Sequence, residues 1–184
     1  MTQYTTNTWL PTLAAPRVQA LLRKIDVVGC SLGADPIVCE DVFGGAPIVG
    51  GYDPERRVVV MNPAVPSAAM TQSEWTRTVT HELIHAFDHC RVAMDPSDCR
   101  HLACTEVRAA NLSGDCDFST DLARGGIFAG GLANAGIRGH QQMCVQRRAV
   151  TSVAMHPPCA SGARDTVNDV FEACYADTAP FPTN

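Results

Sequence analysis

The five residues His81-Glu82-Leu83-Ile84-His85 constrain this chain more than any other feature of its sequence. The two histidines are four positions apart, and residues with this spacing lie on the same side of a helix. Two imidazoles placed in this way can bind one tetrahedral zinc ion. The motif therefore predicts a helix that carries His81 and His85 as metal ligands.

The glutamate of the motif lies about 100° around the helix from the preceding histidine. Zinc lowers the pKa of a bound water to about 7. Glu82 can take a proton from this water as it attacks a peptide carbonyl, and can then give the proton to the leaving amine. Glu82 is therefore the predicted catalytic residue of a zinc-dependent metalloendopeptidase that uses one ion.

A catalytic zinc site needs a third protein ligand. Glu106 ranks first, because it follows His85 by 21 residues on the next predicted helix, and such a helix can pack antiparallel and present a carboxylate. This spacing suits the glutamate-type zincins. Asp88 and His89 remain alternatives, since they follow His85 on nearly the same face and can act as ligands or orient a ligating imidazole.

The helix around the motif has a clear beginning and end. Thr71 and Glu74 form a capping box, and Asp95-Pro96 ends the helix near Met94. Before it, proline opens a helix over residues 16–28. Short β-prone runs follow this first helix, and the turn at residues 53–56 makes the last two a hairpin. These strands are expected at residues 37–41, 46–52 and 57–61.

Further helices are expected at residues 97–112, 140–155 and 162–176, so the fold class is α+β. A small sheet on the motif helix, followed by C-terminal helices, predicts a zincin-like domain of the minimal gluzincin type over residues 1–184. Residues 1–15 are expected to be disordered. Residues 120–139 are a Gly-rich insertion without a stable helix, because each glycine costs roughly 1 kcal/mol there.

The composition excludes several classes of protein. The net charge is −5 and the sequence holds no run of Lys or Arg, so we expect no nucleic-acid partner. No stretch of about 18 apolar residues is present to span a bilayer. No basic residue precedes Arg17, so the start fits neither a secretory signal nor an Arg-rich transit peptide.

Nine cysteines are many for a chain of 184 residues, and none form a Cys-x-x-Cys pair. They favour an oxidising compartment and up to four disulfides, with at least one cysteine left over. Partners cannot be assigned from sequence, but Cys144 and Cys174 are a plausible pair because they lie on two predicted helices.

Two long blocks of the sequence resemble the Atp23 family of mitochondrial inner-membrane proteases. They are residues 79–91 (VTHELIHAFDHCR) and residues 100–116 (RHLACTEVRAANLSGDC), and residues 144–149 and 167–181 extend the similarity. The resemblance implies a metallopeptidase of the mitochondrial intermembrane space that is peripheral to the inner membrane. Zinc ligation then falls on His81 and His85 and catalysis on Glu82, while the third ligand stays open.

The resemblance also implies partners. Members of this family mature ATP synthase subunit 6, assist assembly of the membrane sector of ATP synthase and degrade lipid-transfer proteins of the intermembrane space. They fold oxidatively, which would explain the cysteines. The rival hypothesis is a non-proteolytic assembly chaperone with a structural or vestigial zinc site. The chain departs from the family at Val42, where members usually have a cysteine, so the pairing of Cys30 or Cys39 is open.

Overall fold

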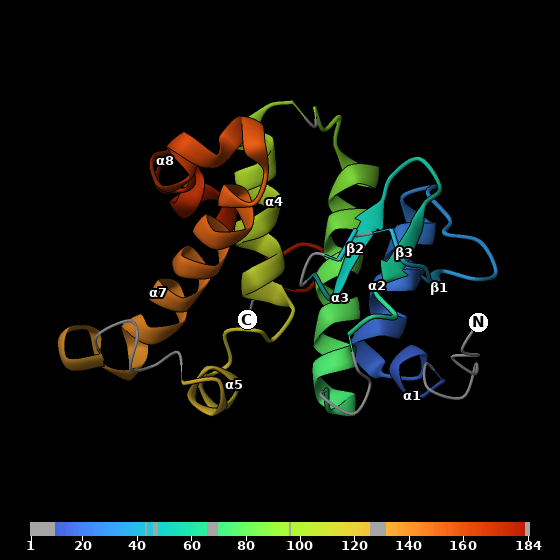
Figure 1. Ribbon diagram of the computed structural model, residues 1–184, viewed down its shortest axis with the longest axis horizontal. Coiled ribbons are helices and arrows are strands. Elements are labelled where there is room, and N and C mark those ends of the chain that lie inside the picture. The colour runs from blue at the N-terminus through green and yellow to red at the C-terminus, as the bar shows by residue number, and fades with distance from the viewer. Residues whose placement is uncertain are drawn as a thin grey trace. The chain divides into compact units, whose positions relative to one another are not determined.

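The computed structural model describes residues 10–42, 44–45, 48–65, 70–95, 97–125 and 132–182. The chain divides into two compact units, Met1–Ala93 and Met94–Asn184 (Figure 1). The first unit holds a small mixed sheet with helices, and the second holds helices among its described residues. This arrangement confirms the α+β class. The single metallopeptidase domain over residues 1–184 stays a prediction, because two units can build one such domain.

The first unit is built around helix α3 (Gln72–Arg91). Helix α2 (Pro16–Val27) packs against it, and the residues it buries, Val18, Leu21 and Ile25, have helical spacing. A disulfide between Cys30 and Cys90 joins the segment after α2 to the end of α3. The short helix α1 (Leu10–Leu13) also packs against α3.

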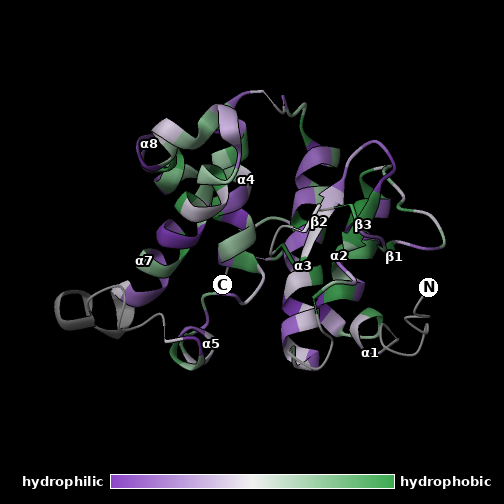
Figure 2. Cartoon of the chain, viewed as in Figure 1, coloured by the Kyte–Doolittle hydropathy of each residue, from purple (hydrophilic) through white to green (hydrophobic). Residues whose placement is uncertain are grey.

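The sheet has three strands in the order β1-β3-β2. Strand β1 (Ile37–Cys39) is parallel to β3 (Val58–Met61), and β2 (Gly50–Asp53) is antiparallel to β3. The predicted hairpin is confirmed. Gly50 allows a close approach of the strands, since a Cβ there would lie 2.7 Å from the sulfur of Met61 and 3.0 Å from the Val60 carbonyl oxygen. Strand β3 is hydrophobic (Figure 2), and β2 and β3 pack against α3.

Helix α3 begins as the sequence predicts. Thr71 accepts a hydrogen bond from the Glu74 amide, and the Glu74 carboxylate accepts one from the Thr71 amide, so the capping box is confirmed. The helix ends at Arg91, three residues before the expected Met94, and Val92 is extended. Cys90 is bonded to Cys30 in this last turn, and Val92 is β-branched, which disfavours continuation of the helix.

The described residues of the second unit form helices α4 (Cys99–Leu112), α5 (Phe118–Ala123), α7 (Leu132–Ala154) and α8 (Ala163–Ala176), with a 3₁₀ helix at Pro157–Gly162. Helix α4 packs against both α7 and α8. Apolar side chains, most of them small or β-branched, fill the space among the three helices. They include Ala103, Val107 and Ala110 from α4, Val145, Ala149 and Val153 from α7, and Val167, Val170 and Phe171 from α8.

Two expectations about disorder are wrong in part. Residues Leu10–Leu13 form α1, although residues 1–9 lie outside the described residues. Helix α7 begins at Leu132, eight residues before the expected start, so part of the Gly-rich insertion is helical. Extending a helix costs far less than starting one, and residues 140–154 provide the start. Residues 126–131 lie outside the described part of the chain.

The second unit contains three disulfides, which join Cys99 to Cys159, Cys104 to Cys174, and Cys116 to Cys144. The proposed Cys144–Cys174 pair is therefore wrong, because each of these cysteines faces one on or just after α4. With Cys30–Cys90, the expected four bridges are present, and Cys39 takes part in none of them.

Each helix that lies in the described residues lacks the combination of length and hydrophobicity needed to cross a membrane.

Candidate metal centre

Helix α3 places the two motif histidines side by side. The ring centroids of His81 and His85 are 4.9 Å apart, with the ring planes inclined at 73°. One ring nitrogen of each lies within 4.8 Å of the other, and both side chains are partly buried. Ring nitrogens this close need only a small rotation of the side chains for both to contact one zinc ion at the usual distance of about 2 Å. The positions of His81 and His85 on α3 therefore suit the binding of one zinc ion by both imidazoles.

Glu82 lies on the same helix between the two histidines and is buried, with 8% of its surface exposed. A carboxylate held in a protected position beside a metal site can act as a general base without being a ligand. The local sequence explains its place. Leu83, Ile84, Ala86 and Phe87 anchor the other faces of α3 in the core.

The two alternative third ligands lie on the last turns of α3. Asp88 is buried, and one of its oxygens accepts a hydrogen bond from Nε of Arg91 at 3.0 Å. The Arg91 guanidinium also lies over the Phe87 ring, 5.4 Å from its centroid. This ion pair gives Asp88 a role in closing the helix. His89 is exposed, and its ring centroid is 6.1 Å from that of Tyr52.

Glu106 lies on α4, in the second unit, and is partly buried. Its carboxylate offers the oxygen ligand that would complete a set of two imidazoles and one carboxylate. Its assignment as the third ligand stays a prediction, as do the roles of the other motif residues.

Tyr52 is a residue near the motif helix that the sequence did not single out. It lies on β2, which packs against α3, and burial raises the pKa of its phenol above the ordinary value of 10.0. Its hydroxyl is buried without a hydrogen-bond partner among the described residues. It also lines a hollow of about 160 Å³ with Gly51, Asp53 and Arg56. The only available signal was its place in a predicted strand, which does not reveal contact with His89.

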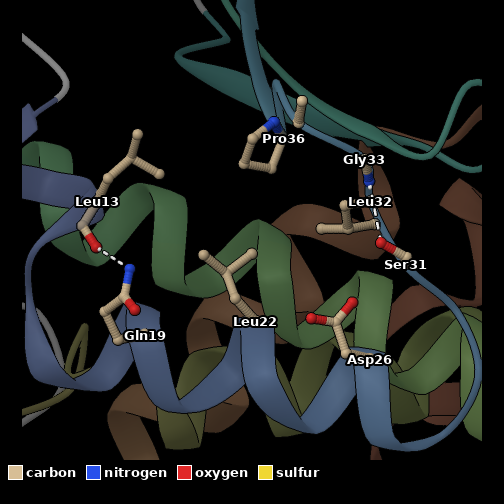
Figure 3. Close-up of a pocket in the computed structure, with 9 residues that line it drawn as sticks. Leu13, Gln19, Leu22, Asp26, Ser31, Leu32, Gly33 and Pro36 are labelled. Atoms are coloured by element: carbon tan, nitrogen blue, oxygen red, sulfur yellow. Dashed lines mark hydrogen bonds between the residues drawn. The ribbon is translucent and has the colours of Figure 1, made fainter.

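A larger hollow, of about 290 Å³, lies between α2 and residues 31–36 of the first unit (Figure 3). Leu22 and Asp26 of α2 line it on one side, and Leu32 lines it on the other. Gln19 donates a hydrogen bond to the Leu13 carbonyl at its end. None of the candidate metal ligands lines this hollow, so it is distinct from the centre on α3.

Comparison with known proteins identifies the family. Residues 5–182 match the model of the Peptidase M76 family. The chain is 40% identical over 170 residues to a zebrafish (Danio rerio) protein named mitochondrial inner membrane protease ATP23 homolog, and 39% identical over 169 residues to the human (Homo sapiens) protein of that name. It is 34% identical over 169 residues to mitochondrial inner membrane protease atp23 of Schizosaccharomyces pombe.

These alignments cover 91%, 90% and 91% of this chain. They cover 62% of the zebrafish protein, 63% of the human protein and 84% of the S. pombe protein, so the chain spans about three fifths of the length of the first two. No solved structure matches. The family match and the identities over nine tenths of the sequence lead to one conclusion: this chain belongs to the Peptidase M76 family.

Proposed function

We propose that this chain is a zinc-dependent endopeptidase with a zincin-like, gluzincin-type site. In this site His81, His85 and Glu106 hold one zinc ion, and Glu82 is the general base. The observation that carries the proposal is the pair of imidazoles 4.9 Å apart on α3 in a member of a peptidase family. A structural zinc site has no use for a base beside its ligands, which favours catalysis over the rival chaperone hypothesis.

The chain's own residues perform the proton transfers. When bound, zinc would polarise the peptide carbonyl and make water a better nucleophile near neutral pH. Glu82 accepts the proton of the attacking water, and the resulting carboxylic acid delivers it to the nitrogen of the departing amine. The anchoring of α3 by its buried face fixes Glu82 and both histidines on one rigid element, which keeps the base close to the reacting atoms.

Glu106 is preferred over Asp88 and His89 as the third ligand. Asp88 already pairs with the Arg91 guanidinium at 3.0 Å, and binding a metal would compete with this ion pair. His89 is exposed at the end of the helix. Glu106 is partly buried on a helix whose opposite side packs in a core, so its carboxylate can be held in place at little entropic cost.

We also propose that the protein acts in the mitochondrial intermembrane space, peripheral to the inner membrane. The names of the relatives and the four disulfides support this location. Its substrates would be membrane-proximal or small proteins of that space. By family resemblance these include ATP synthase subunit 6 and lipid-transfer proteins, together with a role in assembling the membrane sector of ATP synthase.

Replacement of Glu82 by Gln tests the reaction. We expect Glu82→Gln to retain one zinc per chain, measured by elemental mass spectrometry, and to lower kcat/KM for a soluble peptide by about 100-fold or more. Glu172→Gln, an exposed carboxylate on α8, is the matched control and should have full activity. Unchanged turnover in Glu82→Gln would contradict the proposal. Full complementation of a deficient cell by the inactive variant would favour the chaperone hypothesis.

A further inference from the structure

Three arginines of the second unit surround a hollow of about 320 Å³. We call it the arginine hollow. Two of its arginines come from α7 and one directly follows α5. None of the candidate metal ligands or Glu82 lines it. The residues that line it, besides Asp121, are Arg124, Arg147, Arg148, Thr151, Ser152 and Met155.

Two buried carboxylates hold these arginines in place. Asp115 accepts hydrogen bonds from Arg124 and from Arg148, each at 3.1 Å. Asp121 accepts one from Arg147 at 2.6 Å, and its other oxygen is 2.8 Å from a ring nitrogen of His140. Both aspartates are only 4% exposed. The guanidinium groups are therefore positioned before any ligand arrives, so that binding costs little side-chain entropy.

The same network leaves donors unused. A guanidinium has five N–H donors, yet Arg124 and Arg148 each commit one terminal nitrogen to Asp115. The Nε of Arg148 is buried and has no partner among the described residues. The lining of the hollow holds three arginines and one aspartate, which is a local excess of positive charge in a chain whose total is −5. Fixed guanidinium groups with spare donors suit the oxygens of a phosphate.

Exposed apolar side chains accompany the hollow. Met155 lines it and is 62% exposed, and Leu122 of α5, which directly follows Asp121, is 45% exposed. Phe118 is 41% exposed and its ring contacts that of His140, which is bonded to Asp121. Met155 belongs to the lining of the hollow, and Phe118 and Leu122 belong to α5, the helix that carries Asp121, so exposed apolar side chains lie on the elements that build the hollow. Proteins that lie on an anionic bilayer combine these two features.

We propose that the arginine hollow binds the phosphate of an anionic phospholipid headgroup, while Met155, Leu122 and Phe118 contact the acyl boundary of the same bilayer. This surface would attach the protein to the membrane without a spanning helix. The inference rests on the peripheral membrane location proposed above, and it is independent of the peptidase chemistry.

Co-sedimentation of the full, disulfide-bonded chain with vesicles tests the proposal. We expect binding to vesicles of phosphatidylcholine with phosphatidylglycerol, little binding to phosphatidylcholine alone, and weakening by added salt. Arg148→Gln should lower the partition coefficient about five-fold, since each basic residue near an anionic surface contributes about 1 kcal/mol. In this variant Arg124 still pairs with Asp115, so the buried carboxylate is not left without a positive partner. Arg164→Gln, on the exposed part of α8, is the matched control and should bind normally.

A second variant avoids the ion pairs altogether. Met155→Ser should also lower vesicle binding several-fold, whereas Val27→Ser, on an exposed valine of the first unit, should not. Circular dichroism melting curves verify that each variant is folded. Arg148→Gln and Met155→Ser proteins that bind anionic vesicles like the unaltered protein would overturn the proposal.

Two further outcomes separate the proposals from one another. If the unaltered protein ignores anionic vesicles, both the membrane location and the role of the hollow fail, while peptide hydrolysis in solution still reports on the peptidase. If inorganic phosphate at low millimolar concentration binds the hollow and Arg148→Gln abolishes that binding without changing vesicle binding, the site serves free phosphate and the membrane proposal is overturned.

Discussion

The guanidinium of Arg108 lies 2.7 Å from a carboxylate oxygen of Asp177, although the arginine is 1% exposed and lies 69 residues earlier in the chain. The same guanidinium donates to the backbone carbonyls of Asp177 and Ala179. One side chain of α4 therefore satisfies three acceptors on the segment that follows α8. These side-chain contacts, rather than helix or sheet hydrogen bonds, hold the segment after α8 against α4.

Replacing Arg108 by Met should therefore destabilise the protein. The two carbonyls lose their donors, while water can still reach the partly exposed Asp177, so we expect a loss of about 2–4 kcal/mol in the free energy of unfolding. Arg100→Met removes an exposed ion pair to Asp169 and should cost less than about 1 kcal/mol. Denaturant unfolding followed by circular dichroism measures both, and equal losses would contradict the burial argument.

The capping box at Thr71 should stabilise the start of the motif helix. Thr71→Ala removes the acceptor of the Glu74 amide and should lower the free energy of unfolding by about 1 kcal/mol. Thr71→Ser keeps the hydroxyl and should be close to neutral. Thr76→Ala, inside the same helix, is the control and should not destabilise, because alanine is the better helix former there.

Metal content should distinguish the third ligand from its alternatives. We expect Glu106→Ala to lose most of its zinc and its activity, because an incomplete site binds the ion weakly. Asp88→Asn should retain zinc and lose stability, since it removes the charge of a buried carboxylate that is paired with Arg91. Elemental analysis after dialysis measures the bound zinc. The reverse result, with zinc lost only in Asp88→Asn, would identify Asp88 rather than Glu106 as the third ligand.

Peptide mapping under non-reducing conditions should recover the four disulfides. Cys104→Ser with Cys174→Ser should lower the free energy of unfolding by about 4 kcal/mol, because that bridge closes a loop of 70 residues. Cys39→Ser should leave all four bridges intact. A mixed pattern that includes Cys39 in unaltered protein would contradict this connectivity.

The phenols of two tyrosines should lose their protons at a higher pH than an exposed tyrosine does. Burial raises the pKa of Tyr52 and of Tyr175 above 10.0. The folded protein then holds these protons more tightly than the unfolded chain, so their contribution to stability is complete below pH 10 and falls as the pH rises toward the folded pKa values. Absorbance titration of the phenolates measures the shift, and Tyr52→Phe should remove one late component. If every tyrosine titrates with a pKa near 10, the predicted shifts are wrong.

The local parts of the fold were predictable because local chemistry decides them. The capping box at Thr71 set the start of α3 to within a residue, and the turn at residues 53–56 predicted the pairing of β2 with β3. The side-by-side histidines followed from helical spacing alone. Each of these features depends on residues only a few positions apart, where the sequence is most informative.

Long-range features were not predictable in the same way. Cys104 pairs with Cys174 and Cys116 with Cys144 because of how α4, α7 and α8 pack, which nothing in the spacing of the cysteines reveals. The start of α7 was not predictable from glycine propensity, because the glycines near Leu132 extend a helix that the residues after them already form. The arginine hollow was not predictable either, since Arg148 bonds to Asp115, which lies 33 residues earlier in the chain.

Every disulfide closes its ring either before Arg91 or after Asp98. A nick between Cys30 and Cys90, or between Cys99 and Cys174, therefore leaves a single covalent molecule. A nick in the short stretch between Arg91 and Asp98 produces two separate fragments even without a reductant, and each fragment keeps its own cross-links. Between Cys30 and Cys174, a protease can therefore separate the chain into two pieces by a single cut only in that one stretch.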